Sequence, residues 1–356
     1  MTPRDLTSPS RSTRAGSDIR PVYLILSHQH PERVEWLASR IFQLSPSGQC
    51  VVHHDIVDDK VPWAGNPPPR VHLIPRTRAV WGDWSLVQAT LNLITYARQS
   101  LDPTWYVLLS GEDLPVVDLE DWEIAMAESK TDAIIPARPA PRHAPLGRSP
   151  NPFERNYVRS EYRWREVPLL RPHNRRDRAL MRAVMKLSLR AQPFFAVEQA
   201  LAYRDRWFIG TPRTVNLPID WGTWWGPQWL AFSKRTADVF LNVEESITQH
   251  FMSSYIPDQC FFHSIAMNTP DLNISRRLLT YTPRAKAASR FNWLALRADD
   301  LKDIRQRQVA FARKFVPAFD AEIAELVNRD IQESRRRRAE AAHHETSPTN
   351  DSDGNE

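Results

Sequence analysis

Two adjacent carboxylates, Glu112 and Asp113, directly follow a short apolar segment of this sequence. Residues 105–109 are all apolar or aromatic, which is typical of a strand buried on both faces of an α/β sheet. Gly111 then allows a sharp turn, and Pro115 prevents the chain from re-entering a strand ladder at once. Open α/β sheets bind ligands at the carboxyl ends of their strands. The two acids therefore either serve a ligand site or merely cap the next helix.

The segments around these acids alternate between expected strands and helices. We expect strands at 20–27, 49–54, 71–74, 105–109 and 132–136, and helices at 32–44, from 81 to beyond 97, and at 120–130. Such alternation predicts an α/β fold with a mostly parallel central sheet flanked by helices. Because the carboxyl ends of parallel strands share one edge, Ser27, Asp55 and Ser110 to Asp113 should lie together there. Later helices are expected at 234–241 and from Pro257.

The domain organisation predicted from composition is one large domain between two disordered ends. Residues 1–19 and 334–356 are expected to be disordered, and the run Arg335 to Arg338 is expected to be a solvated end. Within the domain at 20–333, residues 137–220 form a segment rich in proline and arginine, with basic helices such as 178–189. This segment is either a solvated insertion or a lid whose arginines meet a diphosphate.

The overall composition favours an anionic small ligand over nucleic acid. The chain has 356 residues, and its 47 bases exceed its 42 acids by only five charges. Neither a P-loop nor a glycine-rich dinucleotide motif is present. Cys50 and Cys260 lie in apolar runs and imply no disulfide framework. The sequence shows no signal peptide and no run of about 18 apolar residues, so we expect a cytoplasmic protein without an integral membrane segment.

Seven segments of the chain resemble the family-14 glycosyltransferases, the core-2/I-branching N-acetylglucosaminyltransferases and peptide O-xylosyltransferases. In order, they are YLILSHQHPERVEWL (23–37), VVHHD (51–55), WGDWSLVQATLNLI (81–94), WYVLLSGEDLPV (105–116), WWGPQWLAFSK (224–234), IPDQCFFHSIAMN (256–268) and FARKF (311–315). Each segment alone is a weak signal, but together in the family's order they are specific. The region from 137 to about 220 matches poorly.

The resemblance implies a GT-A-like fold and inverting transfer of a sugar, of the GlcNAc or xylose type, from a UDP-sugar to an acceptor hydroxyl. The acceptor would be a glycan, a peptide or a small molecule. Such transfer needs a carboxylate base, positive charge at the departing diphosphate and a cleft that aligns the nucleoside. The family is similar to other GT-A enzymes in fold but uses basic side chains where those use a metal. The resemblance therefore implies no metal and no cofactor besides the UDP-sugar substrate.

The resemblance also assigns candidate site residues. Lys314 matches the diphosphate-binding lysine, although it could instead be a lysine whose stem packs on a helix surface. The partnering arginine lies upstream, and Arg284 and Arg290 are both candidates. Asp55 matches a nucleoside-contacting position, or is a simple turn acid. The remaining donor-binding candidates are His28, Ser110, Gly111 and Asp113, and the acceptor-binding candidates are Trp225, Gln228 and Trp229.

The expected catalytic base is where this sequence departs from the family pattern. The family's glutamate stands where this chain has Gln259, in the run Pro257-Asp258-Gln259. An amide is not a useful base, although it can hydrogen-bond a sugar hydroxyl. Asp258 or another carboxylate would have to replace the glutamate, unless transfer is weak or the protein only binds its ligand.

Two further classes of function stay open. Glu112 and Asp113 could be ligands of a manganese-dependent GT-A transferase. Alternatively, Gln259 could mark a non-catalytic protein that binds UDP-sugars or glycans. A nucleic-acid-binding function is the weakest option, because it rests only on net charge and the arginine run.

Overall fold

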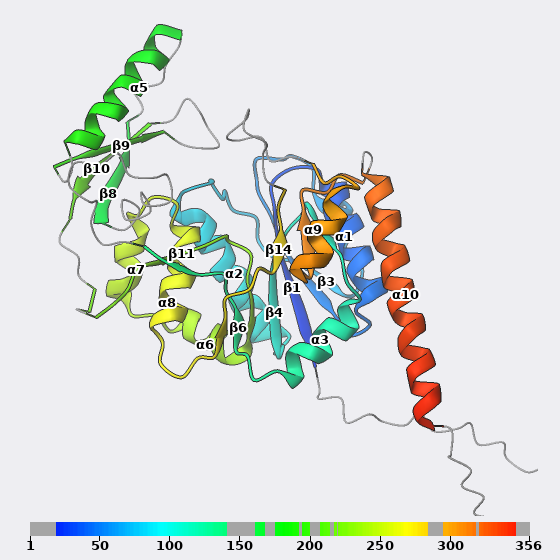
Figure 1. The fold of residues 1–356 in the computed structure, drawn as a ribbon. Helices are drawn as coiled ribbons and strands as arrows, with labels where there is room; N and C mark the ends of the chain where they lie inside the picture. Colours follow the sequence, from blue (N-terminus) through cyan, green and yellow to red (C-terminus); the bar gives the residue numbers. More distant parts are fainter. Residues whose placement is uncertain are drawn as a thin grey trace, which may run out of the picture.

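The computed structural model describes residues 19–140, 161–167, 175–191, 194–199, 207–213, 217–218, 220–283, 295–317 and 320–346. In this part of the chain, the largest sheet has seven strands in the order β13-β6-β12-β4-β1-β2-β3 (Figure 1). Their bounds are β1 (Pro21–Ser27), β2 (Gln49–His54), β3 (Val71–Leu73), β4 (Trp105–Ser110), β6 (Ala133–Ile134), β12 (Ala231–Ser233) and β13 (Ile274–Ser275). β1 pairs in parallel with β2 and β4, and only β12 runs antiparallel to its neighbours. The predicted mostly parallel α/β sheet is confirmed.

The register of the three central strands brings their carboxyl ends to one edge. Ser27 pairs with His54 on β2, and Leu26 pairs with Ser110 on β4. The chain stays close beyond the strand ends, because the Asp55 amide donates to the Ser27 carbonyl at 2.8 Å. The expectation that Ser27, Asp55 and Ser110 lie along one edge is therefore confirmed.

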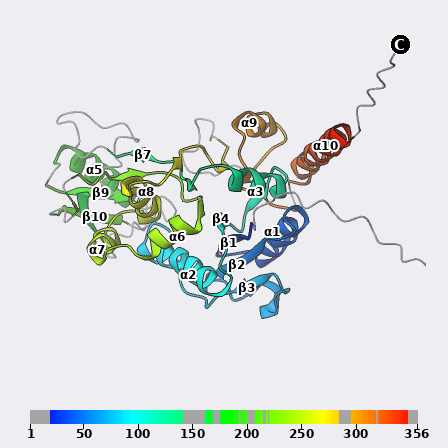
Figure 2. The same cartoon turned by 90° about the horizontal axis from the view of Figure 1, so that it is seen from below.

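Helices cover both faces of the sheet because successive strand residues point to opposite sides. On β1, Tyr23 and Ile25 pack with one helix layer, whereas Val22 and Leu24 pack with the other. The first layer holds α1 (Pro31–Leu44), α3 (Leu119–Glu128), α9 (Asp300–Arg307) and α10 (Ala321–Thr346). The second holds α2 (Trp84–Ser100), α6 (Lys234–Leu241) and α8 (Phe261–Asn268) (Figure 2). Asp83 caps α2 by accepting a hydrogen bond from the Ser85 amide at 2.9 Å.

A second small sheet crosses the carboxyl edge of the large one. It has the order β14-β15-β5, with β14 (Thr280–Tyr281), β15 (Phe311–Arg313) and β5 (Asp113–Pro115). β5 and β15 are antiparallel, and Arg313 stands opposite Asp113. The turn after β4 is thereby joined to residues 200 positions later in the chain.

The proline- and arginine-rich segment contains strands as well as the expected basic helix. β8 (Tyr162–Glu166), β10 (Trp207–Pro212) and β9 (Ala196–Gln199) form an antiparallel sheet, on which α5 (Arg175–Arg190) packs. β7 (Arg138–Pro139) pairs with β11 (Trp224–Trp225). The remaining elements are η1 (Pro62–Gly65), α7 (Glu245–Met252) and η4 (Pro257–Gln259). The sequence did not predict β7, β8, β9 and β10, because these strands are two to six residues long and lack the long apolar run of β4.

The carboxyl-terminal expectation was wrong for residues 334–346, which continue α10 to Thr346. Arg335 donates two hydrogen bonds to the buried Asp118, at 2.6 and 3.0 Å, and Arg338 lies against the same carboxylate. Arg336 and Arg337 are exposed, as expected, but each pairs with a glutamate one helical turn away. Composition alone indicated a solvated end because it does not reveal a partner 217 residues upstream. Residues 347–356 lie outside the described residues.

No helix among the described residues combines the length and the apolar character that crossing a membrane requires.

Replacing Arg335 should destabilise the protein because Asp118 would stay buried with a weaker counter-ion. The Asp118 side chain is 2% exposed, and leaving a buried charge poorly paired costs roughly 1–3 kcal/mol. We expect Arg335→Ala to lower the free energy of unfolding in urea by that amount. Arg337→Ala removes an equal charge from an exposed position of the same helix and should change it by less than about 0.5 kcal/mol. Equal losses for both variants would contradict a specific role for the Asp118 pair.

Glu123 should make the stability of the fold depend on pH. Burial raises the pKa of this carboxyl to about 7, and its partner Tyr23 donates a hydrogen bond to it. Because the folded pKa exceeds the unfolded value, the native state holds the extra proton between these two values. Stability should therefore fall as the pH rises from about 4.5 to about 7. Glu123→Gln keeps an acceptor for Tyr23 and should remove this fall, gaining up to roughly 3 kcal/mol above pH 7. Urea unfolding at pH 4.5 and pH 8 measures the difference, and an unchanged pH profile would contradict the assignment.

Candidate functional site

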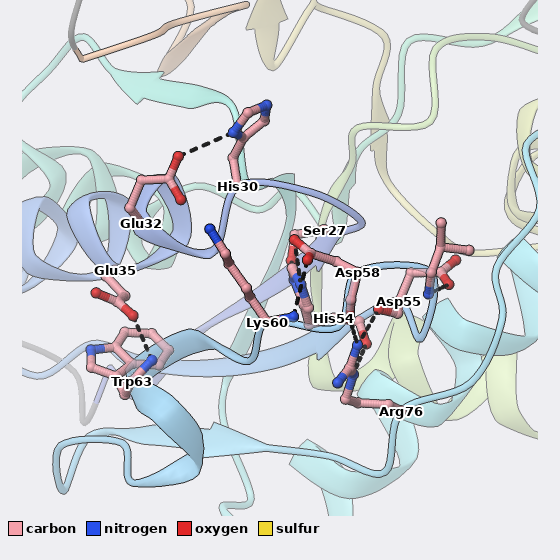
Figure 3. Close-up of polar contacts among 11 residues, drawn as sticks. Ser27, His30, Glu32, Glu35, His54, Asp55, Asp58, Lys60, Trp63 and Arg76 are labelled. Atoms are coloured by element: carbon pink, nitrogen blue, oxygen red, sulfur yellow. Dashed lines mark hydrogen bonds and ion pairs between the residues drawn. The ribbon is translucent and has the colours of Figure 1, made fainter.

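The amino-terminal side of the site is a polar cluster at the ends of β1 and β2 (Figure 3). The Ser27 hydroxyl and His54 Nδ1 are 2.7 Å apart, and His54 Nε2 lies 3.6 Å from the Asp58 carboxylate. Burial lowers the pKa of His54, and nearby Arg76 lowers it further. The His54 ring is therefore neutral near pH 7 and holds the Ser27 hydroxyl in a fixed direction.

Asp55 lies at the predicted edge, where its side chain fixes the chain beyond β2. Its Oδ1 accepts from the Val57 amide at 2.8 Å, and its Oδ2 accepts from the Ala79 amide at 2.7 Å. The residue is 2% exposed. The turn-acid interpretation thus accounts for both carboxylate oxygens, and a contact between Asp55 and a nucleoside stays a prediction.

A cavity of about 370 Å³ lies beside this cluster, between the ends of β2 and β3 and residues 61–62. Its polar lining comes from His54 and Arg76, and the rest is mostly aliphatic side chains and prolines. The Arg76 guanidinium donates to the carbonyls of His54, at 3.2 Å, and Asp55, at 2.7 Å, which fixes this wall (Figure 3). A mostly apolar space with a few fixed polar groups suits a heterocyclic ring.

The centre of the site is a carboxylate held by two cations. Arg33 Nη1 donates to Glu112 Oε1 at 2.6 Å, and Lys314 Nζ lies 2.8 Å from Oε2. Arg33 reaches this place because α1 begins with Pro31 at the sheet edge, which puts its first turn beside the β4 turn. Lys314 follows β15, and the Phe315 amide donates to the Glu112 carbonyl at 2.9 Å. All three side chains are partly exposed, between 16% and 31%, so the cluster faces solvent.

Electrostatics keep this cluster ionised. Burial opposes ionisation of Glu112, but the charge and hydrogen bond of Lys314, aided by Arg313 and Arg33, hold its pKa below the ordinary value. His28 lies in the field of the same groups, and the surrounding protein lowers its pKa, mainly by displacing water. His28 is exposed and neutral near pH 7, and can therefore donate or accept a hydrogen bond.

Asp113 is fully buried and holds the turn after β4 in place. Its Oδ2 accepts from the backbone amide and the hydroxyl of Ser110, at 2.5 and 2.9 Å. Its Oδ1 lies 3.8 Å from Arg313 Nε, and the Arg313 guanidinium stacks over Trp229 at 4.3 Å. Burial raises the pKa of Asp113 and lowers that of Arg313, so each group needs the other to stay charged.

Glu112 and Asp113 do not fit a shared divalent cation. Asp113 is 0% exposed and uses Oδ2 to hold the Ser110 turn, while two cations occupy the oxygens of Glu112. Metal binding would require both arrangements to break. The manganese interpretation therefore lacks support from the geometry of these two residues.

The opposite side of the site is formed by residues 225–229 and the start of α8. The Gly226 amide donates to the Gln259 carbonyl at 3.0 Å, and His263 Nε2 lies 3.1 Å from the Pro227 carbonyl. A Cβ atom at Gly226 would come within 1.9 Å of the Pro136 carbonyl, so only glycine fits this approach. The side-chain amide nitrogen of Gln228 is buried, and it has no hydrogen-bond partner among the described residues.

The two candidate catalytic residues differ in accessibility. Asp258 is 1% exposed, whereas Gln259 is partly exposed. In this conformation, Gln259 is accessible to solvent, whereas the carboxylate of Asp258 is not. Of the acceptor-binding candidates, Trp225 is also partly exposed, while Trp229 is buried under Arg313.

Sequence reasoning did not select Arg33 or Arg313 as site residues. Arg33 lies inside the matched segment 23–37, and a first-turn position after a parallel strand could have indicated it. Arg313 is adjacent to Lys314, but only the β5–β15 register shows that it faces Asp113. The expected arginines Arg284 and Arg290 lie outside the described residues.

Comparison with known proteins supports the family resemblance for the amino-terminal part of the site. Residues 22–151 match the family model described as "Branch: Core-2/I-Branching enzyme". No curated protein matches the chain at a significant level. The matched residues carry His28, Asp55 and the turn from Ser110 to Asp113, whereas residues 224–315 lie outside them. Residues 22–151 are therefore similar to the Core-2/I-branching enzymes, a family of glycosyltransferases.

Proposed function

We propose that this glycosyltransferase moves a sugar of the GlcNAc or xylose type from a UDP-sugar to an acceptor hydroxyl, with inversion and without a metal. The observation that carries the proposal is the convergence of Arg33, Arg313 and Lys314 around Glu112 at the carboxyl edge of the sheet. These three cations outnumber the carboxylates Glu112 and Asp113, so this cluster keeps a net positive charge. Basic side chains placed there stabilise a departing diphosphate, whose charge grows in the transition state.

The donor nucleoside fits the side of the site formed by β1 and β2. The cavity beside His54 and Arg76 has room for a heterocyclic ring. From there the diphosphate would extend past His28 toward Lys314, whose charge acts on that histidine. The backbone at Ser110 and Gly111 lies between these points, at the end of β4. Asp55 contributes by holding the wall of the nucleoside side in place, and Arg290 remains a candidate second cation from sequence alone.

The acceptor fits the side formed by Trp225, Gln228 and Gln259. Trp225 offers a partly exposed aromatic face, on which a sugar ring can pack. Gln228 offers an unpaired buried donor. Gln259 orients the attacking hydroxyl, while the missing carboxylate makes proton removal slow.

A non-catalytic protein that binds UDP-sugars is the second candidate function. The amide of Gln259 at the base position favours it, since an amide takes no proton near neutral pH. Both candidates require the same cationic edge, so only turnover separates them.

Removing the charge of Lys314 should weaken diphosphate binding specifically. We expect Lys314→Ala to weaken UDP binding by roughly 10- to 100-fold, because a charge-assisted contact to phosphate is worth about 1.5–3 kcal/mol. Uridine binding should change by less than about twofold, because uridine carries no phosphate. Isothermal titration of both ligands measures the difference.

Lys130→Ala is the matched control for this experiment. Lys130 is exposed just before β6, at the opposite edge of the sheet, so it removes the same charge far from the phosphates. Equal losses of UDP and uridine binding in Lys314→Ala would show that Lys314 supports the fold and does not bind phosphate.

Restoring a carboxylate at residue 259 should accelerate transfer. A positioned general base contributes about 10²–10⁴-fold to a rate, and Gln259→Glu is nearly isosteric. We expect this variant to raise the rate of UDP release from a UDP-sugar, with a glycan acceptor or with water. Asp258→Asn is the neighbouring control, and its folding is checked by circular dichroism. An unchanged rate in Gln259→Glu with a lost rate in Asp258→Asn would make Asp258 the base. If neither change matters and UDP still binds, the binding-protein function is the correct one.

A further inference from the structure

The small antiparallel sheet β8-β10-β9 has an inner and an outer face. On the inner face, Trp164 and Phe208 pack against Tyr255 of the main body, with ring centroids 5.2 and 5.7 Å apart from it. On the outer face, Val197 and Trp207 pack against α5. α5 is therefore the outermost layer of this part of the molecule, and it projects away from the large sheet (Figure 1).

The packed side of α5 does not use all of its apolar residues. Val184 and Met185 contact the outer face, and the Ser188 hydroxyl accepts from the Val197 amide at 3.1 Å. Leu180 and Leu187, two helical turns apart, are 64% and 62% exposed. Phe194, just beyond the helix, is 80% exposed. Residues seven apart lie on one side of a helix, so the two leucines form a single apolar strip in solvent.

Basic residues lie on the same helix and on the neighbouring strand β8. The sequence of α5 carries six bases and one acid, and Lys186 is exposed beside Leu187. Arg163 and Arg165 on β8 are also exposed. The register places Arg165 opposite Ile209, on the same face that α5 covers, so both arginines flank the helix. Among the described residues, the three strands place no carboxylate on this outer face, because Glu166 and Glu198 pair with Phe208 on the inner one.

We propose that α5, together with Phe194, Arg163 and Arg165, docks this protein on an anionic lipid bilayer. Exposed leucines and a phenylalanine insert below the headgroups, while the lysine and arginines meet the lipid phosphates. A nucleic acid would use the cations but leave the apolar strip in water. The combination of both features therefore fits a lipid surface. The proposal is independent of the glycosyl transfer proposed above, since no residue of this surface belongs to that site.

Sedimentation with lipid vesicles tests the proposal. The full-length protein should bind vesicles of phosphatidylglycerol mixed with phosphatidylcholine and should bind pure phosphatidylcholine far more weakly. The double variant Leu180→Ser, Leu187→Ser should reduce binding to the anionic vesicles by at least about tenfold, because each leucine loses its apolar transfer energy. Met252→Ser changes a residue on α7 that is 52% exposed and should leave binding unchanged.

A fluorescence measurement keeps the test independent of loss of folding. Both native cysteines are buried, so Leu187→Cys can be labelled with an environment-sensitive dye in the folded protein, with Met252→Cys as its matched control. Anionic vesicles should shift the emission of the dye at 187 to shorter wavelength and leave the dye at 252 unchanged. No shift at 187, equal shifts at both positions, or vesicle binding that the leucine changes do not affect would overturn the proposal. Stronger binding to an RNA oligomer than to vesicles would overturn it as well.

Discussion

The geometry of the site depends on the buried pairing between Asp113 and Arg313. Asp113 holds the turn after β4 through Ser110, and its ion pair fixes β15 in register with β5. That register carries Lys314 to the position where it meets Glu112. An ion pair with so little exposure adds little net stability, because desolvation offsets much of the Coulomb attraction. Its value here is positional, since it joins segments 200 residues apart at one sheet edge.

Glu112 acts as an internal counter-ion for Arg33 and Lys314. Its carboxylate keeps Arg33 and Lys314 from repelling each other and holds both side chains extended toward the edge. Under the function proposed above, a diphosphate would offer more oxygen acceptors than one carboxylate and would take over both contacts. Such an exchange of one anion for another would leave neither cation unpaired.

The sequence could predict the main architecture because long apolar strands and amphipathic helices alternate clearly through residue 134. The shared edge of β1, β2 and β4 followed from that alternation alone. The sheet pattern also returns at 224–232, but the antiparallel direction of β12 and the short strands of the 162–212 region could not be read in this way. These strands are three to six residues long, and pairing partners distant in sequence define them. The helical course of α10 beyond residue 334 likewise depends on Asp118, which no local pattern reveals.

At the site, sequence similarity selected Lys314 and Gln259, and physical reasoning selected the acids after β4. The role of Asp55 needed the structure, because only coordinates show both of its oxygens bound to backbone amides. The same holds for Arg33, whose place opposite Glu112 follows from where α1 starts. Sequence patterns do not show which way a side chain points, so they miss roles that depend on that direction.

The close approach at Gly226 has a consequence for anyone who would redesign the acceptor specificity. The two neighbouring acceptor-binding candidates, Trp225 and Gln228, are partly exposed and can be varied in a library. Gly226 itself leaves no space for a methyl group beside the Pro136 carbonyl. Libraries that randomise 225 and 228 while keeping glycine at 226 preserve the backbone contact to residue 259. If the whole segment were randomised, most clones would lose that contact.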